Sequence, residues 1–131
     1  MLKQALIVAM GGALGSVARY KLGGFILHHT GSWNFPASTF CVNVFGCFVM
    51  GTLAAMAEHH DLFSASARGF VFTGILGGFT TFSAFGYENA FLLRRGMPDI
   101  ALAYAALSVT CGVVGVLLGI KLVDLMWPPS H

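Results

Sequence analysis

Charged residues are scarce in this chain. They make up 9% of its 131 residues, whereas hydrophobic residues make up 56% and the mean hydropathy is +0.79. Soluble domains usually carry about 25% charged residues. The composition therefore excludes a separate soluble catalytic domain. It indicates an integral membrane protein with little mass outside the lipid bilayer.

Signatures for cofactors, nucleotides and nucleic acids are also missing from the sequence. Cys41, Cys47 and Cys111 lie in apolar segments, at spacings that fit neither a disulfide framework nor a metal site. The nucleotide-binding pattern G-x-x-x-x-G-K-[ST] is missing too, which argues against pumping driven by ATP. The net charge of +2 comes from scattered basic residues. We therefore expect no enzyme activity, no organic cofactor and no nucleic-acid partner.

What the chain does have is four long apolar segments. About 20 apolar residues cross the hydrocarbon core of a bilayer as a helix. We expect four transmembrane helices at about residues 4–27, 36–58, 67–94 and 99–125, which form one all-α domain over residues 1–131. Gly11 and Gly15 are one helical turn apart, as are Gly115 and Gly119, and small residues at this spacing let membrane helices approach closely.

The third segment contains a weak point. Residues 69–87 carry no charge, but the middle of this stretch holds glycines, two adjacent threonines and a serine, which are poor helix formers. Backbone groups freed by a break inside a bilayer are tolerated only where they are buried in protein or line a polar cavity. Interrupted membrane helices commonly hold ions. We therefore expect the third helix to be broken at mid-membrane and the protein to pass ions.

The basic residues show no preference for one side of the membrane. If the N-terminus is cytoplasmic, the basic residues on the inside are Lys3, Arg68 and Lys121. Those on the outside are then Arg19, Lys21, Arg94 and Arg95. The positive-inside rule needs an excess on one side to set the orientation. Its absence here favours insertion in both orientations, and hence an antiparallel dual-topology homodimer.

Three polar residues in or near the apolar spans are candidates for ion chemistry. Arg19 could attract an anion or be paired structurally. Glu88 could lie in a vestibule or form a salt bridge with Arg19 or Arg94. Asn43 offers two N–H donors, which suit a small anion, but it could also join two helices by a hydrogen bond. The residues alone leave these alternatives open.

Aromatic and hydroxyl side chains also recur at helical spacing. Phe82 and Phe85 are three residues apart, and Tyr104 and Ser108 are four apart, so each pair shares a helix face. The phenylalanines could pack against lipid or turn their electropositive ring edges toward an anion. The hydroxyls could form a polar track or join helices. Carbonyls freed by the break would suit Na⁺, whereas the positive end of a half-helix that starts near Phe82 would favour an anion.

Three motifs make the chain resemble a known family. GGALGSVARY at residues 11–20, TFCVNVFG at 39–46 and GGFTTFSAF at 77–85 occur in the order found in the Fluc (CrcB-type) family of fluoride channels. The resemblance covers all four spans and is close to the bacterial homodimeric members. It implies a passive, fluoride-selective channel in the bacterial inner membrane that exports fluoride from the cytoplasm and so protects against it. It also implies an antiparallel homodimer with two pores and a structural Na⁺ on the two-fold axis.

The resemblance also assigns roles to residues. The implied fluoride-pore residues are Thr39, Asn43, Phe82, Ser83, Phe85, Tyr104 and Ser108. The carbonyls of Gly77 and Thr80 would hold the Na⁺, and Arg19 and Glu88 would act electrostatically in the vestibule. Gly112 departs from the pattern because it has no hydroxyl one turn after Ser108, which would shorten the polar track.

Two other classes of protein remain as alternatives. Small multidrug-resistance exporters are also short, span the membrane four times and often have dual topology. They use a glutamate in the first span, where this chain has Arg19 and no acidic residue. The other alternative is an assembly subunit that transports nothing, which predicts no conductance in the purified protein.

Overall fold

The protein is helical throughout the part of the chain that the structure describes. A computed structural model describes residues 1–128, without the side chain of His60. Its elements are α1 (Leu2–Thr30), α2 (Ala37–His60), α3 (Ala65–Arg68), the π-helix η1 (Gly69–Leu76), α4 (Gly77–Phe79), α5 (Phe82–Arg94) and α6 (Pro98–Met126). Four helical segments, Leu2–Thr30, Ala37–His59, Ala65–Arg94 and Pro98–Met126, are long and apolar enough to cross a membrane. This confirms the prediction of an all-α protein with four apolar spans.

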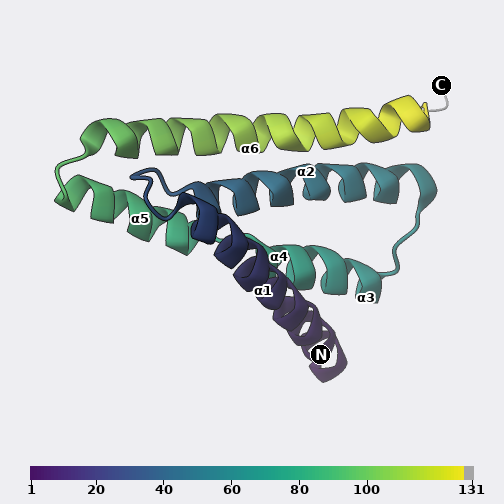
Figure 1. Cartoon of the computed structure of the whole chain (residues 1–131). Coiled ribbons are helices and arrows are strands. Elements are labelled where there is room, and N and C mark those ends of the chain that lie inside the picture. The colour runs from purple at the N-terminus through teal and green to yellow at the C-terminus, as the bar shows by residue number, and fades with distance from the viewer. Residues whose placement is uncertain (129–131) are drawn as a thin grey trace.

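The helices pair through their backbones. In Figure 1, α2 and α6 lie side by side, the segment from α3 to α5 runs beneath them, and α1 crosses obliquely. α1 packs on η1 and α4. A Cβ at Gly15 of α1 would meet the carbonyl oxygen of Ile75, and one at Gly119 of α6 would meet that of Phe48. Only glycine permits these contacts, so the predicted role of these glycines in close packing is confirmed.

The third span changes its backbone geometry along its length. It starts as α3, continues as the π-helix η1 and ends its first part at Phe79. Thr80 and Thr81 then have extended backbone, with φ/ψ of −86°/155° and −147°/115°. The chain becomes helical again at Phe82, where the Thr81 hydroxyl accepts a hydrogen bond of 3.2 Å from the N–H of Ala84. Thr81 thereby turns a backbone N–H and a carbonyl, both without partners in the helix itself, toward Asn43 of α2.

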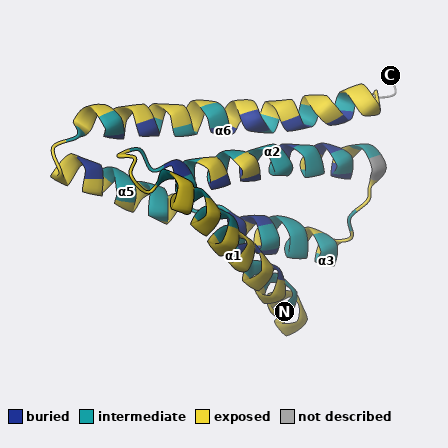
Figure 2. Ribbon diagram, viewed as in Figure 1, coloured by how far each residue is buried: buried dark blue, intermediate teal, exposed yellow. Residues whose placement is uncertain are grey.

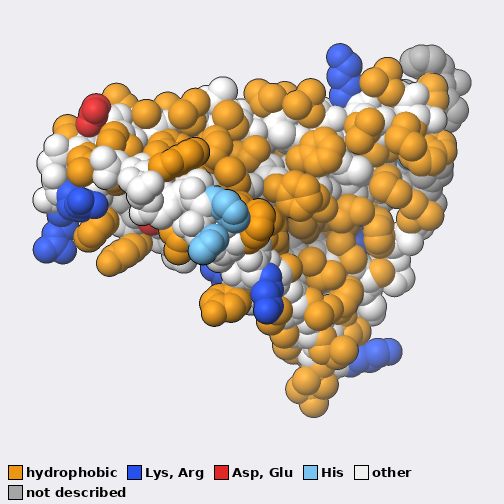
Figure 3. All heavy atoms as spheres, viewed as in Figure 1, with side chains coloured by type: hydrophobic (Ala, Val, Ile, Leu, Met, Phe, Trp, Pro, Cys, Tyr) orange, Lys and Arg blue, Asp and Glu red, His pale blue; other side chains and the backbone are white. Residues whose placement is uncertain are grey.

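The surface of the folded chain is largely apolar. Exposed and half-buried residues occur along every helix in Figure 2, between a smaller number of buried ones, and hydrophobic side chains cover much of the face shown in Figure 3. Large side chains such as Leu102 and Leu125 are each 72% exposed. Exposed apolar surface on this scale fits contact with lipid or with another subunit rather than with water. Together with the four spans, it marks a multi-pass membrane protein.

Candidate functional site

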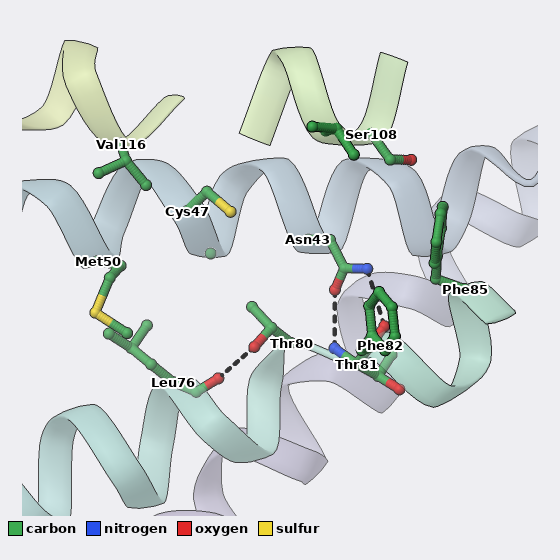
Figure 4. Close-up of a pocket in the computed structure, with 12 residues that line it drawn as sticks. Asn43, Cys47, Met50, Leu76, Thr80, Thr81, Phe82, Phe85, Ser108 and Val116 are labelled. Atoms are coloured by element: carbon green, nitrogen blue, oxygen red, sulfur yellow. Dashed lines mark hydrogen bonds between the residues drawn. The ribbon is translucent and has the colours of Figure 1, made fainter. Parts of the chain in front are cut away.

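A cavity of about 300 Å³ lies between α2, α6 and the extended residues of the third span (Figure 4). Its lining residues are Asn43, Gly46, Cys47, Met50, Leu76, Thr80, Thr81, Phe82, Phe85, Ser108, Val109 and Val116. Five of them are site residues predicted from the sequence, namely Asn43, Thr80, Phe82, Phe85 and Ser108. The lining includes no Asp, Glu, His, Lys or Arg, so any ion in it would meet dipoles and rings rather than a full charge.

Asn43 is paired with the backbone of Thr81. Its Nδ2 donates to the Thr81 carbonyl at 3.0 Å, and the Thr81 N–H donates to its Oδ1 at 2.8 Å. The amide therefore satisfies both backbone groups of an extended residue, as a neighbouring strand would. Of the two alternatives for Asn43, the structure shows the hydrogen bond between helices. An amide has a second N–H on the same nitrogen, which leaves one donor available for a ligand.

Phe82 and Phe85 form an aromatic edge to the cavity. Their ring centroids are 5.5 Å apart and their planes are tilted by 33°. The Phe82 ring is 83% exposed, whereas Phe85 is half-buried and lies 5.1 Å from the ring of Tyr104. Contacts within the chain thus hold Phe85, whereas the Phe82 ring stays exposed to any neighbouring molecule.

Ser108 brings an unsatisfied hydroxyl to the cavity. Its Oγ is buried and has no hydrogen-bond partner in the described part of the chain. Buried polar groups are nearly always hydrogen-bonded to protein or to ordered water. The hydroxyl is therefore placed to bind water or an ion within the cavity. Ser83, by contrast, is exposed and lies outside the cavity lining, although its hydroxyl is 3.3 Å from that of Thr81.

Glu88 lies at the centre of a second polar cluster. Thr39 Oγ1 donates to Glu88 Oε1 at 2.6 Å, and the Tyr104 hydroxyl donates to Glu88 Oε2 at 2.7 Å. Tyr104 is completely buried. The salt bridge considered with Arg19 or Arg94 does not form among the described residues; two neutral hydroxyls from α2 and α6 hold the carboxylate instead. Hydrogen bonds to a charged group contribute more than neutral ones, about 1.5–3 kcal/mol each.

The second cluster opens on a different side of the bundle. Thr39 and Glu88 line a groove of about 300 Å³ between α5 and the loop that joins α1 to α2, rather than the first cavity. Phe85 lies between the two sites, because it lines the first cavity and its ring contacts Tyr104. Apart from Ser83, the predicted pore residues are therefore divided into two groups that meet at Phe85.

Arg19 is paired with the third span. Its Nε donates to the carbonyl oxygen of Gly78 at 3.1 Å. In a continuous helix this carbonyl would accept the N–H of Phe82, but the helix ends before that residue. Of the two alternatives for Arg19, the structure shows the structural pairing. No local pattern in the sequence indicates this contact, since the two residues lie on different spans.

The carbonyls of Gly77 and Thr80 fit a hard cation. In a continuous helix they would accept the N–H groups of Thr81 and Ala84, but these N–H groups donate to the side chains of Asn43 and Thr81 instead. Both carbonyl oxygens therefore lack their helical donors. Backbone carbonyls released in this way are typical Na⁺ ligands in interrupted membrane helices. The donor set is consistent with the implied ion.

The fold and the cavity together define the class of the protein. It is a multi-pass membrane protein whose uncharged cavity adjoins the extended part of one span. The family described as "CrcB-like protein, Camphor Resistance (CrcB)" has a model that matches residues 6–120. The chain belongs to this family.

Curated relatives give the same result over nearly the whole chain. A protein of Methylobacillus flagellatus named "Fluoride-specific ion channel FluC" is 48% identical over 122 residues, covering 93% of this chain and 95% of that protein. Proteins of the same name from Rhodospirillum centenum and Rhizobium meliloti are each 43% identical, covering 93% and 92% of this chain and 96% of each relative. The relatives are named as channels rather than enzymes, which confirms the prediction that the chain is not an enzyme.

Proposed function

We propose that the protein is a passive, fluoride-selective ion channel. The observation that carries this proposal is the 48% identity to a fluoride-specific channel, which extends over all four spans. The cavity supports it independently, because its polar groups are few and uncharged and include hydrogen-bond donors. We take the interrupted third span to lie at mid-membrane, where its freed backbone groups would need the partners described above.

The chemistry of fluoride matches this lining. Fluoride is small and holds its water tightly, so a pore must replace that water with close donors and still release the ion. The second N–H of Asn43, the hydroxyl of Ser108 and the ring edges of Phe82 and Phe85 can supply such contacts. None carries a full charge, so none would trap the anion.

A second copy of the chain would complete the site. The Phe82 ring is 83% exposed at the edge of the cavity, which a subunit in the opposite orientation would cover. The even distribution of basic residues permits both orientations in one membrane. The proposal is therefore an antiparallel, dual-topology homodimer with two pores, each using rings from both subunits.

Na⁺ would act as a structural ion in this dimer. The carbonyls of Gly77 and Thr80 would hold it, and Gly77 is exposed, so the same groups of a second subunit can approach. When bound, the ion would neutralise carbonyl dipoles that the interrupted helix leaves unpaired. The Arg19 guanidinium likewise pairs with the neighbouring carbonyl of Gly78, which also lacks its helical donor.

The direction of transport follows from the membrane potential. Fluoride enters cells as its neutral acid and is released as the anion inside. In the bacterial inner membrane, the inside-negative potential drives an anion outward with about 2.3 kcal/mol per 100 mV. A passive channel would therefore export fluoride from the cytoplasm and protect the cell from it.

The test is fluoride efflux from liposomes that contain the purified protein. A fluoride electrode follows release when valinomycin lets K⁺ balance the charge, and the experiment is repeated with chloride. We expect rapid fluoride efflux and no chloride efflux. Fluoride movement only in the presence of a proton or cation gradient would favour a secondary transporter, and no movement under any gradient would favour an inert subunit.

A further inference from the structure

The space beside Gly112 is filled by a thiol. Gly112 follows Ser108 by one turn on α6 and is buried. A Cβ at Gly112 would lie 3.4 Å from Cys47 Sγ of α2. The thiol therefore occupies the position next to α6 where a side chain of the following turn would lie.

Cys47 also marks the end of the polar part of the cavity. In Figure 4 it lies between a polar side, formed by Asn43 and Ser108, and an apolar side, formed by Met50 and Val116. Cys47 is one helical turn after Asn43 on α2. On α2 and α6, the polar groups of the cavity are thus the Asn43 amide, the Ser108 hydroxyl and then the Cys47 thiol. On the far side of Cys47 the lining from these two helices is apolar.

We propose that Cys47 is a further pore-lining residue, whose thiol continues the polar row beyond Ser108 and contacts the passing anion or its water. This inference rests on the proposed function. A thiol is small and polarizable and can donate a weak hydrogen bond without adding a full charge. The buried, unpartnered hydroxyl of Ser108 independently calls for a hydrogen-bond partner, which water or an ion in the same cavity would supply.

A thiol on the ion path should react with a small water-soluble reagent that enters the pore. With aminoethyl methanethiosulfonate, the Cys47 thiol loses its proton to solvent and its sulfur attacks the sulfenyl sulfur of the reagent. A mixed disulfide forms and methanesulfinate leaves, so the step needs no other oxidant. Cys41 is exposed and Cys111 is half-buried, and neither lines the cavity, so they provide matched control thiols.

The first experiment uses the Cys41→Ser/Cys111→Ser protein in liposomes, which keeps the single thiol at Cys47. We expect the reagent to label this thiol, measured by intact mass, and to stop fluoride efflux. In the Cys47→Ser protein we expect treatment to leave the efflux at its own untreated rate. An unlabelled Cys47, or a labelled one with undiminished efflux, would overturn the inference.

The two proposals fail in different ways. A protein without fluoride efflux before any treatment would contradict the proposed function, and the role of Cys47 in a pore would fall with it. A protein with normal efflux whose Cys47 does not react would contradict only the role of Cys47. The labelling measured by mass reports separately whether the thiol faces water.

A second experiment separates a polar role from simple packing. Cys47→Ala should lower efflux, because it removes the thiol. Adding Gly112→Ser should restore efflux, since the new hydroxyl enters the vacated space from α6, whereas Gly112→Ala fills similar space without a polar group. Equal efflux from the two double variants, both eluting as folded dimers in size-exclusion chromatography, would show that only packing matters and would overturn the inference.

Discussion

Asn43 and Thr81 exchange two hydrogen bonds across two different spans. The Asn43 amide donates to the Thr81 carbonyl at 3.0 Å and accepts from the Thr81 N–H at 2.8 Å. One side chain thereby takes the place of a peptide group for a residue that has left the helix. The same nitrogen retains a second N–H, so the residue that holds the interruption in place can also serve an ion beside it.

Replacement of Asn43 should destabilise the protein. Asn43→Leu leaves both backbone groups of Thr81 unpaired, at a cost of about 1–3 kcal/mol for each buried group. Asn43→Asp in its protonated form can still accept from the N–H and donate its O–H to the carbonyl, so its loss of stability should be smaller. We expect the thermal unfolding temperature in detergent to fall in the order Asn, Asp, Leu. A Leu variant as stable as the parent would contradict the pairing described here.

Phe82→Ile should abolish or strongly reduce fluoride efflux without unfolding the protein. The ring is 83% exposed within the subunit, so its loss removes little burial there. Isoleucine has no electropositive ring edge to offer an anion. Efflux from liposomes gives the rate, and size-exclusion chromatography gives the assembly state. An unchanged fluoride rate in a correctly assembled variant would exclude the ring-edge mechanism.

Tyr104→Phe should expose the charge of Glu88 to the ion path. It removes one of the two hydroxyls that hold the carboxylate and leaves the ring contacts in place. A less neutralised carboxylate repels an anion more strongly, so we expect slower fluoride efflux and a lower unfolding temperature. Glu88→Gln in the Tyr104→Phe background should recover part of the rate, because it removes the charge. If the double variant were no faster than Tyr104→Phe, charge would not be the cause.

Gly15→Ala should prevent stable folding, whereas Gly24→Ala on the same helix should be tolerated. A Cβ at Gly15 would meet the backbone of Ile75 and Phe79, while one at Gly24 has no atom of another residue within 4 Å. The two variants change the same chemical group on α1, so helix propensity cannot explain a difference between them. The yield of monodisperse protein and its unfolding temperature provide the measurement. Equal stability of the two would contradict the close backbone contact.

Replacement of Na⁺ by a larger cation should lower the thermal stability of the protein. The carbonyls of Gly77 and Thr80 lack helical donors, and a bound ion stabilises the state that binds it in proportion to the logarithm of its concentration. We expect the unfolding temperature to rise with Na⁺ and not with the same concentration of N-methylglucamine chloride. If the unfolding temperature changed in the same way with the concentration of either salt, the proposal of a bound Na⁺ would be wrong.

Features of the chain that are local in sequence could be predicted, and those that join distant residues could not. The four spans and the closely packed glycines follow from apolar length and residue spacing, and the structure contains both. The partners of Glu88 and Arg19 could not be found this way, because Thr39 and Gly78 lie on other spans. The π-helix η1 was not predicted either, because its 8 residues are too few for the wider side-chain spacing of a π-helix to show in the sequence. The dimer, the Na⁺ and the roles of the pore residues remain predictions.

The glycine contacts have a consequence for the surrounding lipid. At Gly15 between α1 and the third span, and at Gly51 and Gly119 between α2 and α6, backbone atoms meet closely, so side chains have little room to rearrange there. Each of these two helix pairs should therefore tilt or translate as one rigid unit. A bilayer thicker or thinner than the apolar surface must then bend its own leaflets to match the protein, at a cost of fractions of a kcal/mol per Å of mismatch. The mismatch in thickness between protein and bilayer would therefore be accommodated by deformation of the membrane rather than by sliding of the helices within the protein.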